Sequence, residues 1–560
     1  MIYWRCAMSL QAVVVPPIPA ETLRVAQIVF RKGNRYMQMR DEFGAFYQDH
    51  QFAALYATQG QPAIAPWRLA LVTVMQFVED LSDRQAAEAV RSRIDWKYAL
   101  SLELDDPGFD YSVLSEFRQR LVEAQAEHIL LEAMLKCFQA KGLLKARGKQ
   151  RTDSTHVLSS VRAMGRLEHL GETLRATLND LASVAPNWVQ QQIPVEWYDR
   201  YGTRCEEYRI PKRTQEREDW VTTVGADGFY LLEVLYAEAT PEALRQREAV
   251  QLLRQMWLQQ YYAPAPDEPI RLRAAQDCPP NALRLCSPYD PQARQSLKRS
   301  MTWIGYKVHL TESCDEQLPH LLTHVETTSA TTPDHQAVPF IHEALQRQNL
   351  LPQQHLVDQG YTSTQLLVSS QRDYQLDLLG PVSVNSQWQA QAAQGFSLSD
   401  FQIDWQKQRV YCPAGQRNLT WKAGRDGGGY SVIFVRFAKQ QCSVCPLRSQ
   451  CTRSNKAGAR ALTFKAQEDF QMLQAARERQ HTQAFRDAYA TRAGIEGTLS
   501  QALRVCGLRQ CRYIGLAKTH LQHVLSALAL NVLRAVAWLD GVPLARTRQS
   551  RFARLAPSPT

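Results

Sequence analysis

Two aspartates in strand-like segments are the residues best suited to chemistry. Asp153 stands in the otherwise uncharged run TDSTHV, and Asp358 stands in HLVDQGY, where Gly360 permits a sharp turn just after it. An aspartate is disfavoured on a half-buried strand, so each needs a compensating partner, and a divalent cation is one. The alternative interpretation is that each aspartate only caps a turn, which we would prefer for one isolated aspartate.

A third acid, Glu496, stands in a segment with helical spacing. Tyr489, Arg492 and Glu496 occur at positions i, i+3 and i+7, so on one helix they share a face. Gly494 and Gly497 flank the glutamate and permit close approach by another backbone or by DNA. Two strand aspartates and one helix glutamate predict a site for a pair of Mg²⁺ ions, which suit in-line attack on a phosphodiester. The alternative is an ion pair between Arg492 and Glu496 on a solvated surface.

The charge of the chain indicates a polyanionic partner. The sequence has 65 Lys+Arg against 55 Asp+Glu, a net charge of +10. Residues 427–467 contain seven basic residues and no acid, and residues 497–560 contain nine basic residues and one acid. Such stretches attract phosphate backbones through counterion release. The basic residues that we predict to contact DNA are Arg448, Arg453, Lys456, Arg460, Arg504, Arg509, Arg512 and Lys518.

Aromatic residues interleave with the first of these acid-free stretches. They are Tyr430, Phe434, Phe437 and Phe464. Aromatic rings can stack on unpaired bases, but burial in a core is the stronger expectation.

Four cysteines have spacing that suits a thiolate metal site. Cys412, Cys442, Cys445 and Cys451 form the pattern C-x29-C-x2-C-x5-C. We predict a structural tetrathiolate zinc site, which would stabilise an insertion with few apolar residues. The alternative, four unrelated buried thiols, stays open on spacing alone.

The elements that must position these residues begin with helices. Pro66–Asp80 is a dense apolar run, and Ser82 with Gln85 forms a capping-box signature for a helix that reaches about Ile94. A third helix is predicted over residues 112–141. The first two helices form a pair that either contacts DNA or serves only in packing.

Strands and a final helix follow. The predicted strands are residues 150–158, 303–311, 320–328 and 355–358, with a helix over 336–348 between the last two. Residues 381–464, rich in Gln, Gly and aromatics, predict a β-rich insertion. Residues 521–539 repeat apolar side chains at helical spacing and predict a core helix. No uninterrupted apolar run reaches the roughly 18 residues of a membrane-spanning helix, so we expect no membrane partner.

The blocks around these residues resemble the DDE transposases of bacterial insertion sequences. The branch they resemble most is the IS eleven-eighty-two family, related to the IS four and IS five groups. The resemblance spans nearly the whole chain. Residues 81–121 resemble the N-terminal helical domain, 152–175 the first-Asp block, 303–313 and 319–328 the next core strands, 356–363 the second-Asp block and 488–531 the Glu block.

The resemblance implies roles for individual residues. The catalytic, metal-binding residues would be Asp153, Asp358 and Glu496. Tyr489 and Arg492 match the Tyr and Arg of the related signature Y-x2-R-x3-E-x6-K, whereas its final Lys is Leu503 here, with Arg504 next to it. The implied cofactors are two Mg²⁺ or Mn²⁺ ions. The implied partners are double-stranded DNA, from the terminal inverted repeats of the element and from the target, and a second copy of the chain.

The fold implied by the resemblance is α/β. A ribonuclease-H-like catalytic core, with a mixed sheet and flanking helices, would be interrupted by insertions and preceded by an all-α domain. The expected domains are 1–145, helical, for DNA binding or assembly; 146–380, the first part of the core, with a mostly helical insert at about 162–300; 381–464, the cysteine-containing insertion; 465–540, the last part of the core; and 541–560, a basic tail.

The expected activity is Mg²⁺-dependent strand cleavage at the ends of the element and transfer of the freed 3′-OH into target DNA. A catalytically inactive or domesticated DNA-binding relative is one alternative, and a nuclease without strand transfer is another. The start of the chain lacks a convincing cationic leader, so we expect a bacterial cytoplasmic protein associated with the nucleoid.

Overall fold

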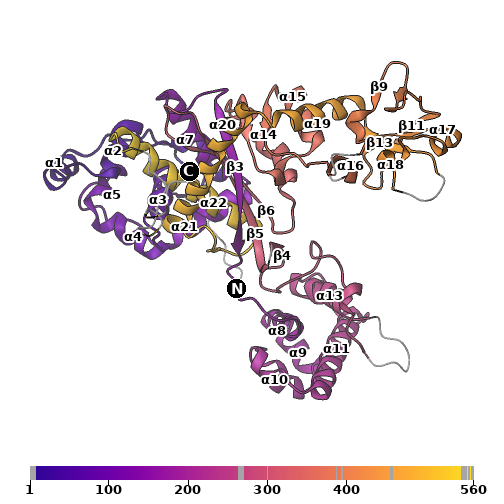
Figure 1. The fold of residues 1–560 in the computed structure, drawn as a ribbon. Coiled ribbons are helices and arrows are strands. Elements are labelled where there is room, and N and C mark those ends of the chain that lie inside the picture. Colours follow the sequence, from indigo (N-terminus) through magenta and orange to yellow (C-terminus); the bar gives the residue numbers. More distant parts are fainter. Residues whose placement is uncertain are drawn as a thin grey trace. The chain divides into compact units, whose positions relative to one another are not determined.

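The structure is a computed structural model that describes residues 8–262, 270–298, 300–385, 387–391, 395–453, 458–543, 552 and 555 (Figure 1). The chain divides into two compact units. The first comprises Met1–Lys145, Asp153–Pro333 and Ile495–Thr560, and the second comprises Ala146–Thr152 and Asp334–Gly494. Strand β3 (Lys149–Leu158) therefore begins in the second unit and ends in the first.

Helices dominate the N-terminal part of the first unit. They are α1 (Ala20–Val29), α2 (Arg35–Phe43), the 3-10 helix η1 (Asp49–Leu55), α3 (Pro66–Val78), α4 (Asp83–Ser92), α5 (Ile94–Ala99), α6 (Ser112–Glu123) and α7 (His128–Ala140). Two short strands, β1 (Met8–Ser9) and β2 (Gln61–Pro62), pair in parallel before α3. Helix α3 is buried over nearly its whole length, as its apolar sequence predicts.

Two predictions for these helices have different outcomes. The capping box of α4 is confirmed, because the Ser82 side chain accepts from the Gln85 N–H and the Gln85 side chain accepts from the Ser82 N–H. The single helix predicted over 112–141 is wrong, because α6 and α7 are separate. Gln125 takes a left-handed backbone conformation, with φ of 52°, which ends the first helix.

The sheet of the first unit combines β3 with an antiparallel meander. Strands β4 (Arg294–Lys298), β5 (Met301–Ser313) and β6 (Leu322–Ser329) pair in chain order, and β5 also lies beside β3. Residues 306–311 alternate between apolar and polar side chains, which suits a strand. The strands predicted over 303–311 and 320–328 are thus confirmed with slightly different ends.

Helix α22 (Leu516–Leu539) packs against β6 and against α3. The amide of Asn531 accepts from the Leu322 N–H at 2.7 Å and donates to the Leu322 carbonyl at 2.8 Å, which fixes the helix to the end of the strand. Within the described residues, α22 alone is long and apolar enough to cross a membrane by length and composition, but 78% of its apolar window is buried inside the structure. The predicted core helix is confirmed.

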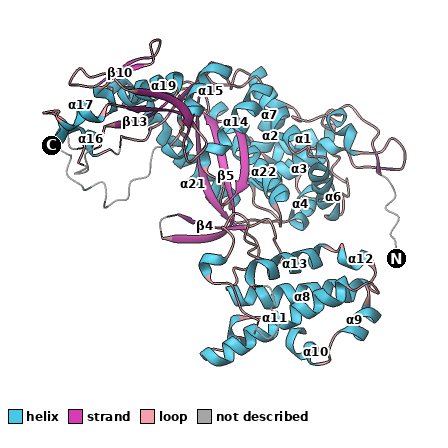
Figure 2. Cartoon of the chain, turned by 90° about the vertical axis from the view of Figure 1, so that its right-hand side faces the viewer, coloured by secondary structure: helices cyan, strands magenta, loops and turns pink. Residues whose placement is uncertain are grey.

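The segment between β3 and β4 is helical, as predicted. It contains α8 (Arg166–Val184), α9 (Pro186–Gln192), α10 (Glu196–Tyr201), η2 (Glu207–Arg209), α11 (Thr214–Tyr236), α12 (Glu242–Arg245), α13 (Glu248–Gln260) and η3 (Ala275–Asp277). Figure 2 shows α8, α11 and α13 side by side, and they share a hydrophobic core of their own. At the crossing of α11 and α13, Trp257 lies against Gly228, where a Cβ would collide with the indole.

The second unit is built on a parallel sheet. The first residues of β3 pair in parallel with β7 (Gln354–Leu356), which pairs in parallel with β8 (Asp377–Leu379). The helical elements of this unit are η4 (Asp334–Ala337), α14 (Val338–Arg347), η5 (Gln359–Tyr361), α15 (Thr364–Tyr374), α19 (Gln467–Arg479), α20 (Gln483–Ala490) and η7 (Thr491–Ala493). Helix α21 (Gly494–Cys506) leads back into the first unit.

Residues 381–464 form small sheets and short helices. Strands β9 (Gln402–Asp404) and β10 (Arg409–Tyr411) make one hairpin, and β11 (Thr420–Arg425), β12 (Ser431–Arg436) and β13 (Ala461–Lys465) make an antiparallel sheet. The helical turns are α16 (Trp388–Gln391), η6 (Leu398–Asp400), α17 (Lys439–Ser443) and α18 (Arg448–Cys451). The β-rich character is confirmed.

The α/β class, the mixed sheet and the helical N-terminal part are therefore as expected. The ribonuclease-H-like topology and the predicted domain boundaries stay predictions. The predicted basic tail, 541–560, lies mostly outside the described residues.

Candidate active site and cysteine cluster

Asp153 lies on β3, as predicted, within the first unit. Its side chain is half-buried, and its Oδ1 accepts from the Ser154 N–H at 2.8 Å. Two residues further along the strand, the Thr155 hydroxyl accepts from Arg509 Nε at 2.9 Å. Burial lowers the pKa of His156, and the positive charge of Arg509 lowers it further, so this imidazole is neutral at physiological pH.

Glu496 lies exposed on the first turn of α21, and the helix is anchored by its buried neighbours Ile495 and Thr498. The Thr498 hydroxyl donates to Oε2 of Glu312 at 2.6 Å, and Arg534 Nη1 lies 2.7 Å from the same oxygen. Glu312 is fully buried. The buried pair of Glu312 and Arg534 therefore holds α21 in place, and sequence reasoning missed it.

Asp358 lies in the second unit, directly after β7. It is the N-cap of η5, and its Oδ1 accepts from the Gly360 N–H at 2.8 Å. The carboxylate is 38% exposed, and its Oδ2 is 3.9 Å from Nη2 of Arg492. A Cβ at Gly360 would lie 3.1 Å from Oδ1 of Asp358 and 3.1 Å from Oδ2 of Asp334, so two carboxylates approach this glycine.

Tyr489, Arg492 and Glu496 do not share one helix, so that expectation is wrong. Tyr489 lies on α20, Arg492 on the 3-10 turn η7, and Glu496 on α21. Tyr489 stacks on Phe485, with ring centroids 5.5 Å apart. The 3-10 turn η7 separates α20 from α21, so the three residues do not lie on one continuous α-helix.

Arg151 explains this turn. The side chain is buried although charged, and it donates to the Thr491 carbonyl in η7. Its guanidinium occupies the space where a Cβ of Gly494 would stand. Gly494 thus permits the predicted close approach, but by a side chain of β3, whereas Gly497 has open space around it. The sequence signal was an arginine in a strand, two residues before Asp153.

The basic residues of the first unit fall into two groups. Arg504 and Lys518 are exposed. Arg512 forms an ion pair with Asp80, donates to the Leu81 carbonyl at 3.2 Å and lies over the ring of Phe77 at 4.5 Å. Arg512 therefore serves to join the segment before α22 to the end of α3.

Basic residues near the cysteines are also held by the protein. Arg448 Nη1 donates to the carbonyls of Cys442, at 3.3 Å, and Gly458, at 3.0 Å. Arg453 lies over the ring of Trp388, 4.2 Å from its centroid. Burial lowers the pKa of Arg460. Lys456, which was also predicted to contact DNA, lies outside the described residues.

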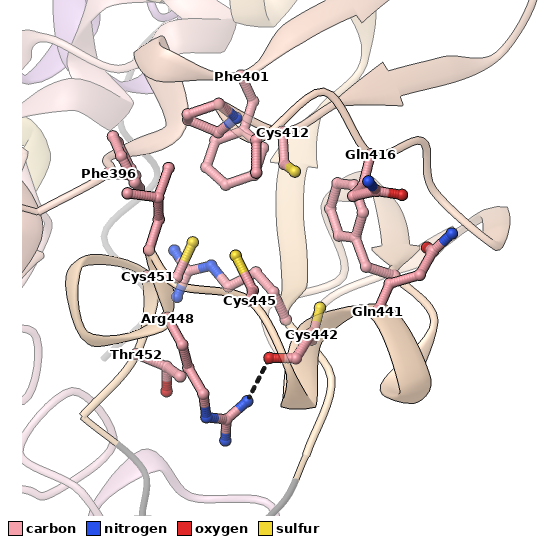
Figure 3. A pocket seen from close by; sticks show the side chains of 15 residues that line it. Phe396, Phe401, Cys412, Gln416, Gln441, Cys442, Cys445, Arg448, Cys451 and Thr452 are labelled. Carbon is pink, nitrogen blue, oxygen red and sulfur yellow. Dashed lines mark hydrogen bonds between the residues drawn. The ribbon is translucent and has the colours of Figure 1, made fainter.

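The four predicted cysteines line one cavity of about 30 Å³ in the second unit. Figure 3 shows the sulfur atoms of Cys412, Cys442, Cys445 and Cys451 facing the same space. Cys412 and Cys445 each begin a tight turn: the Gly415 N–H donates to the Cys412 carbonyl, and the Arg448 N–H donates to the Cys445 carbonyl. Three of the cysteines also pack against the hydrophobic core of the insertion.

The charges around the cavity complement thiolates. Burial raises the pKa of the Cys451 thiol, and the other three cysteines raise it further, whereas Arg460 acts in the opposite direction. The Nε of Arg460, at the edge of the cavity, is buried and has no hydrogen-bond partner among the described residues. All four thiols are free of disulfides.

In the part of the chain that the structure describes, no group of three or more His, Cys, Asp or Glu side chains is arranged to hold a metal ion. The three acids and the four cysteines accordingly stay predicted ligands.

Two family models match the chain. One, described as Transposase domain (DUF772), matches residues 26–120, and the other, described as Transposase DDE domain, matches residues 411–536. The chain carries two transposase domains. No curated protein and no solved structure matches it.

The transposase DDE domain makes the chain a phosphoryl-transfer enzyme with DNA as its substrate, and enzymes with this domain use divalent metal ions. Its match contains Glu496, Tyr489 and Arg492, as well as the four cysteines. Asp153 and Asp358 lie outside both matches. The DUF772 transposase domain covers α1 to α6 with the exception of the first residues of α1 and the last residues of α6.

Proposed function

We propose that the chain is the transposase of an insertion sequence of the IS eleven-eighty-two-like branch. It cuts a DNA strand at the ends of the element and joins the freed 3′-OH to target DNA. Asp153, Asp358 and Glu496 are its metal-binding residues, in a ribonuclease-H-like core. Arg492, which lies beside Asp358, supports the site.

The observation that carries this proposal is the register of two paired strands. Asp153 and Asp358 each follow one of two register partners by the same number of residues. Strand β3 pairs with β7 in parallel, and Arg151 is the register partner of Leu356. Asp153 follows Arg151 by two residues, and Asp358 follows Leu356 by two residues. Two carboxylates at the same offset from a pair of register partners are compatible with a shared metal site, and this equal offset supports the proposal.

The donor set suits Mg²⁺ or Mn²⁺. Carboxylate oxygens are the ligands that these hard cations prefer, and two bound ions would activate a nucleophile and stabilise charge on the phosphorus-bound oxygens. The Gly360 N–H orients the Asp358 carboxylate through Oδ1. Oδ2 lies 3.9 Å from Nη2 of Arg492, whose positive charge favours the approach of a phosphate.

The partners follow from this activity. Arg504, Arg509 and Lys518 in the first unit, with Tyr489 in the second, are the DNA contacts that we propose. A dimer on paired terminal inverted repeats fits the need to cut two ends together. The protein would act in the bacterial cytoplasm, at the nucleoid.

We further propose that Cys412, Cys442, Cys445 and Cys451 hold a structural zinc ion. Thiolates select zinc over magnesium, and a cavity of about 30 Å³ has room for one ion. A tetrathiolate zinc centre carries a net charge of −2, which Arg448 and Arg460 beside it would offset. The unpartnered Nε of Arg460 would then gain a thiolate acceptor.

A cleavage and joining assay tests the activity. The full chain is incubated with DNA that contains the ends of its element, and with random DNA, with and without Mg²⁺. We expect strand cuts at the ends and joined products only with Mg²⁺. Cuts without joining would identify a nuclease, and binding without cuts would identify an inactive relative; either result contradicts the proposal.

A further inference from the structure

The sheet β11–β12–β13 has two different faces. Cross-strand partners share a face, and successive residues alternate between faces. The buried face contains Trp421, Val435, Leu462 and Phe464, which pack into the core of the insertion. The opposite face contains Lys422 opposite Phe434, Arg436 opposite Thr420, and Lys465 opposite Val432.

Two aromatic rings lie exposed on this second face. Phe434 is 36% exposed and Tyr430, just before β12, is 51% exposed. The sequence expectation of burial is confirmed for Phe437 and Phe464, which are 3% and 4% exposed, and is wrong for these two. We call Lys422, Tyr430, Phe434, Arg436 and Lys465 the basic aromatic face.

The ring edge of Phe434 lies close to Gly424 on the neighbouring strand. A Cβ at Gly424 on β11 would lie 2.9 Å from Cε2 of Phe434, so the ring lies across this position. Only a residue without a side chain leaves that room, because any Cβ would push the ring away.

The charges on the face are available to a ligand. Lys422 and Arg436 are exposed, and Lys465 Nζ lies over the Tyr430 ring, 5.5 Å from its centroid. Among the described residues, neither Lys422 nor Arg436 forms an ion pair. The nearby Asp426 is engaged in its own turn, where Oδ1 accepts from the N–H groups of Gly428 and Tyr430 at 2.9 Å. By contrast, Arg448, Arg453 and Arg460 are held by contacts within the protein.

We propose that the basic aromatic face binds unpaired DNA, with phosphates at Lys422 and Arg436 and a base stacked on Phe434. Stacking selects unpaired bases, since bases within a duplex are already stacked on their neighbours. The inference rests on the proposed function, which supplies DNA as the partner. It places the DNA contact of the insertion on the sheet instead of on the arginines around the cysteines.

Binding of the full chain to two labelled DNAs tests this proposal. One is a blunt duplex, and the other is the same duplex with an unpaired 3′ extension; affinity is measured without Mg²⁺, so that no cleavage occurs. Phe434→Ala should weaken binding of the extended DNA about tenfold, since stacking contributes roughly 1–3 kcal/mol per base, and should change blunt-duplex binding little. Phe434→Leu keeps an apolar cover over Gly424 and should lose the same preference, whereas Phe434→Tyr should retain it.

Charge variants provide the second arm. Lys422→Gln with Arg436→Gln should lower the slope of log affinity against log salt on the extended DNA by about 1.4, at roughly 0.7 per phosphate contact on single strands. Lys407→Gln with Arg409→Gln removes the same charge from the exposed β9–β10 hairpin and should leave the slope unchanged.

The outcomes separate this proposal from the proposed function. If Phe434→Ala and Phe434→Leu bind both DNAs as the wild type does, or if they weaken both equally, the stacking site is wrong. The transposase function would still stand if those variants cut DNA ends. A wild-type chain that binds neither DNA would contradict the function itself.

Discussion

Arg151 and Asp153 are two residues apart on one strand and differ in burial and in hydrogen bonding. Arg151 is buried against Gly494 and donates to the Thr491 carbonyl, whereas Asp153 is half-buried and its Oδ1 accepts from the N–H of its neighbour Ser154. The sequence allowed the strand position of Asp153 to be predicted, because an acid in a β-branched run is conspicuous. It did not reveal Arg151, since nothing in the local sequence shows that a turn 340 residues later needs a donor.

The contact between Gly494 and Arg151 predicts how substitution of this glycine changes the stability of the protein. Gly494→Ala should destabilise the protein by roughly 1–3 kcal/mol, because its methyl group would displace a buried, hydrogen-bonded guanidinium. Gly497→Ala is the matched control: it has open space and should be neutral or more stable by about 0.5–1 kcal/mol, through helix propensity. Thermal unfolding of the purified variants measures both effects.

A double variant tests whether the loss of stability in Gly494→Ala comes from the collision with the Arg151 side chain. In an Arg151→Ala background, adding Gly494→Ala should cost little further stability, because the colliding side chain is gone. Equal costs of Gly494→Ala with and without Arg151 would show that the contact does not account for the glycine.

At the scale of elements, periodicity predicted most strands and helices but not their interruptions. The β3, β5, β6 and α22 segments follow from alternation and helical spacing. The segment from Tyr489 to Glu496 has helical spacing too, yet η7 interrupts it, because a tertiary contact from Arg151 outweighs local propensity. The cysteine spacing predicted one shared metal site. All four cysteines line one cavity, but no three of them are arranged to hold a metal ion in the described part of the chain, so the zinc site stays a prediction.

If the four cysteines hold zinc, the folding of the whole insertion should depend on that ion. Purified protein should hold one zinc ion per chain, and a strong zinc chelator should expose residues 405–465 to proteolysis while the rest of the chain stays resistant. Added zinc, but not Mg²⁺, should restore resistance. Acid should promote zinc release, because the pKa of the Cys451 thiol is raised and protons compete for the sulfur.

Cysteine variants check which thiols are ligands. Cys442→Ser should lose the zinc, whereas Cys137→Ser, on α7 and outside the cavity, should keep it. Zinc content is measured on the purified chains. Protein that contains no zinc, or a Cys442→Ser variant with unchanged content, would return the cysteines to the interpretation of buried thiols.

At the scale of the whole molecule, the net charge of +10 predicted DNA binding but not which basic residues are available to bind the DNA. Arg512 and Arg534 belong to a strongly basic stretch, yet each is paired with an acid of its own unit, Asp80 and Glu312. Composition counts charges and cannot distinguish a paired arginine from an exposed one. Burial and ion pairs in the structure make that distinction.

The salt dependence of DNA affinity tests whether the exposed basic residues contact DNA and the paired arginines do not. Arg504→Gln with Lys518→Gln should lower the slope of log affinity against log salt on duplex DNA by up to about 1.8, at roughly 0.9 per phosphate contact. Arg512→Gln should leave the slope unchanged but lower the melting temperature, since it breaks the contact with Asp80. A normal melting temperature with a reduced slope for Arg512→Gln would assign that residue to DNA instead.

Cleavage by single variants tests most directly whether the three acids form one metal-dependent catalytic site, as we propose. Asp153→Asn, Asp358→Asn and Glu496→Gln are each compared with the wild type for Mg²⁺-dependent cutting of DNA that contains the element's ends, alongside their DNA affinity. Loss of a metal ligand removes nucleophile activation and charge stabilisation together. Each variant should therefore lose nearly all cleavage and keep its affinity for DNA. Full cleavage by any one of the three would contradict the assignment of that residue to the site.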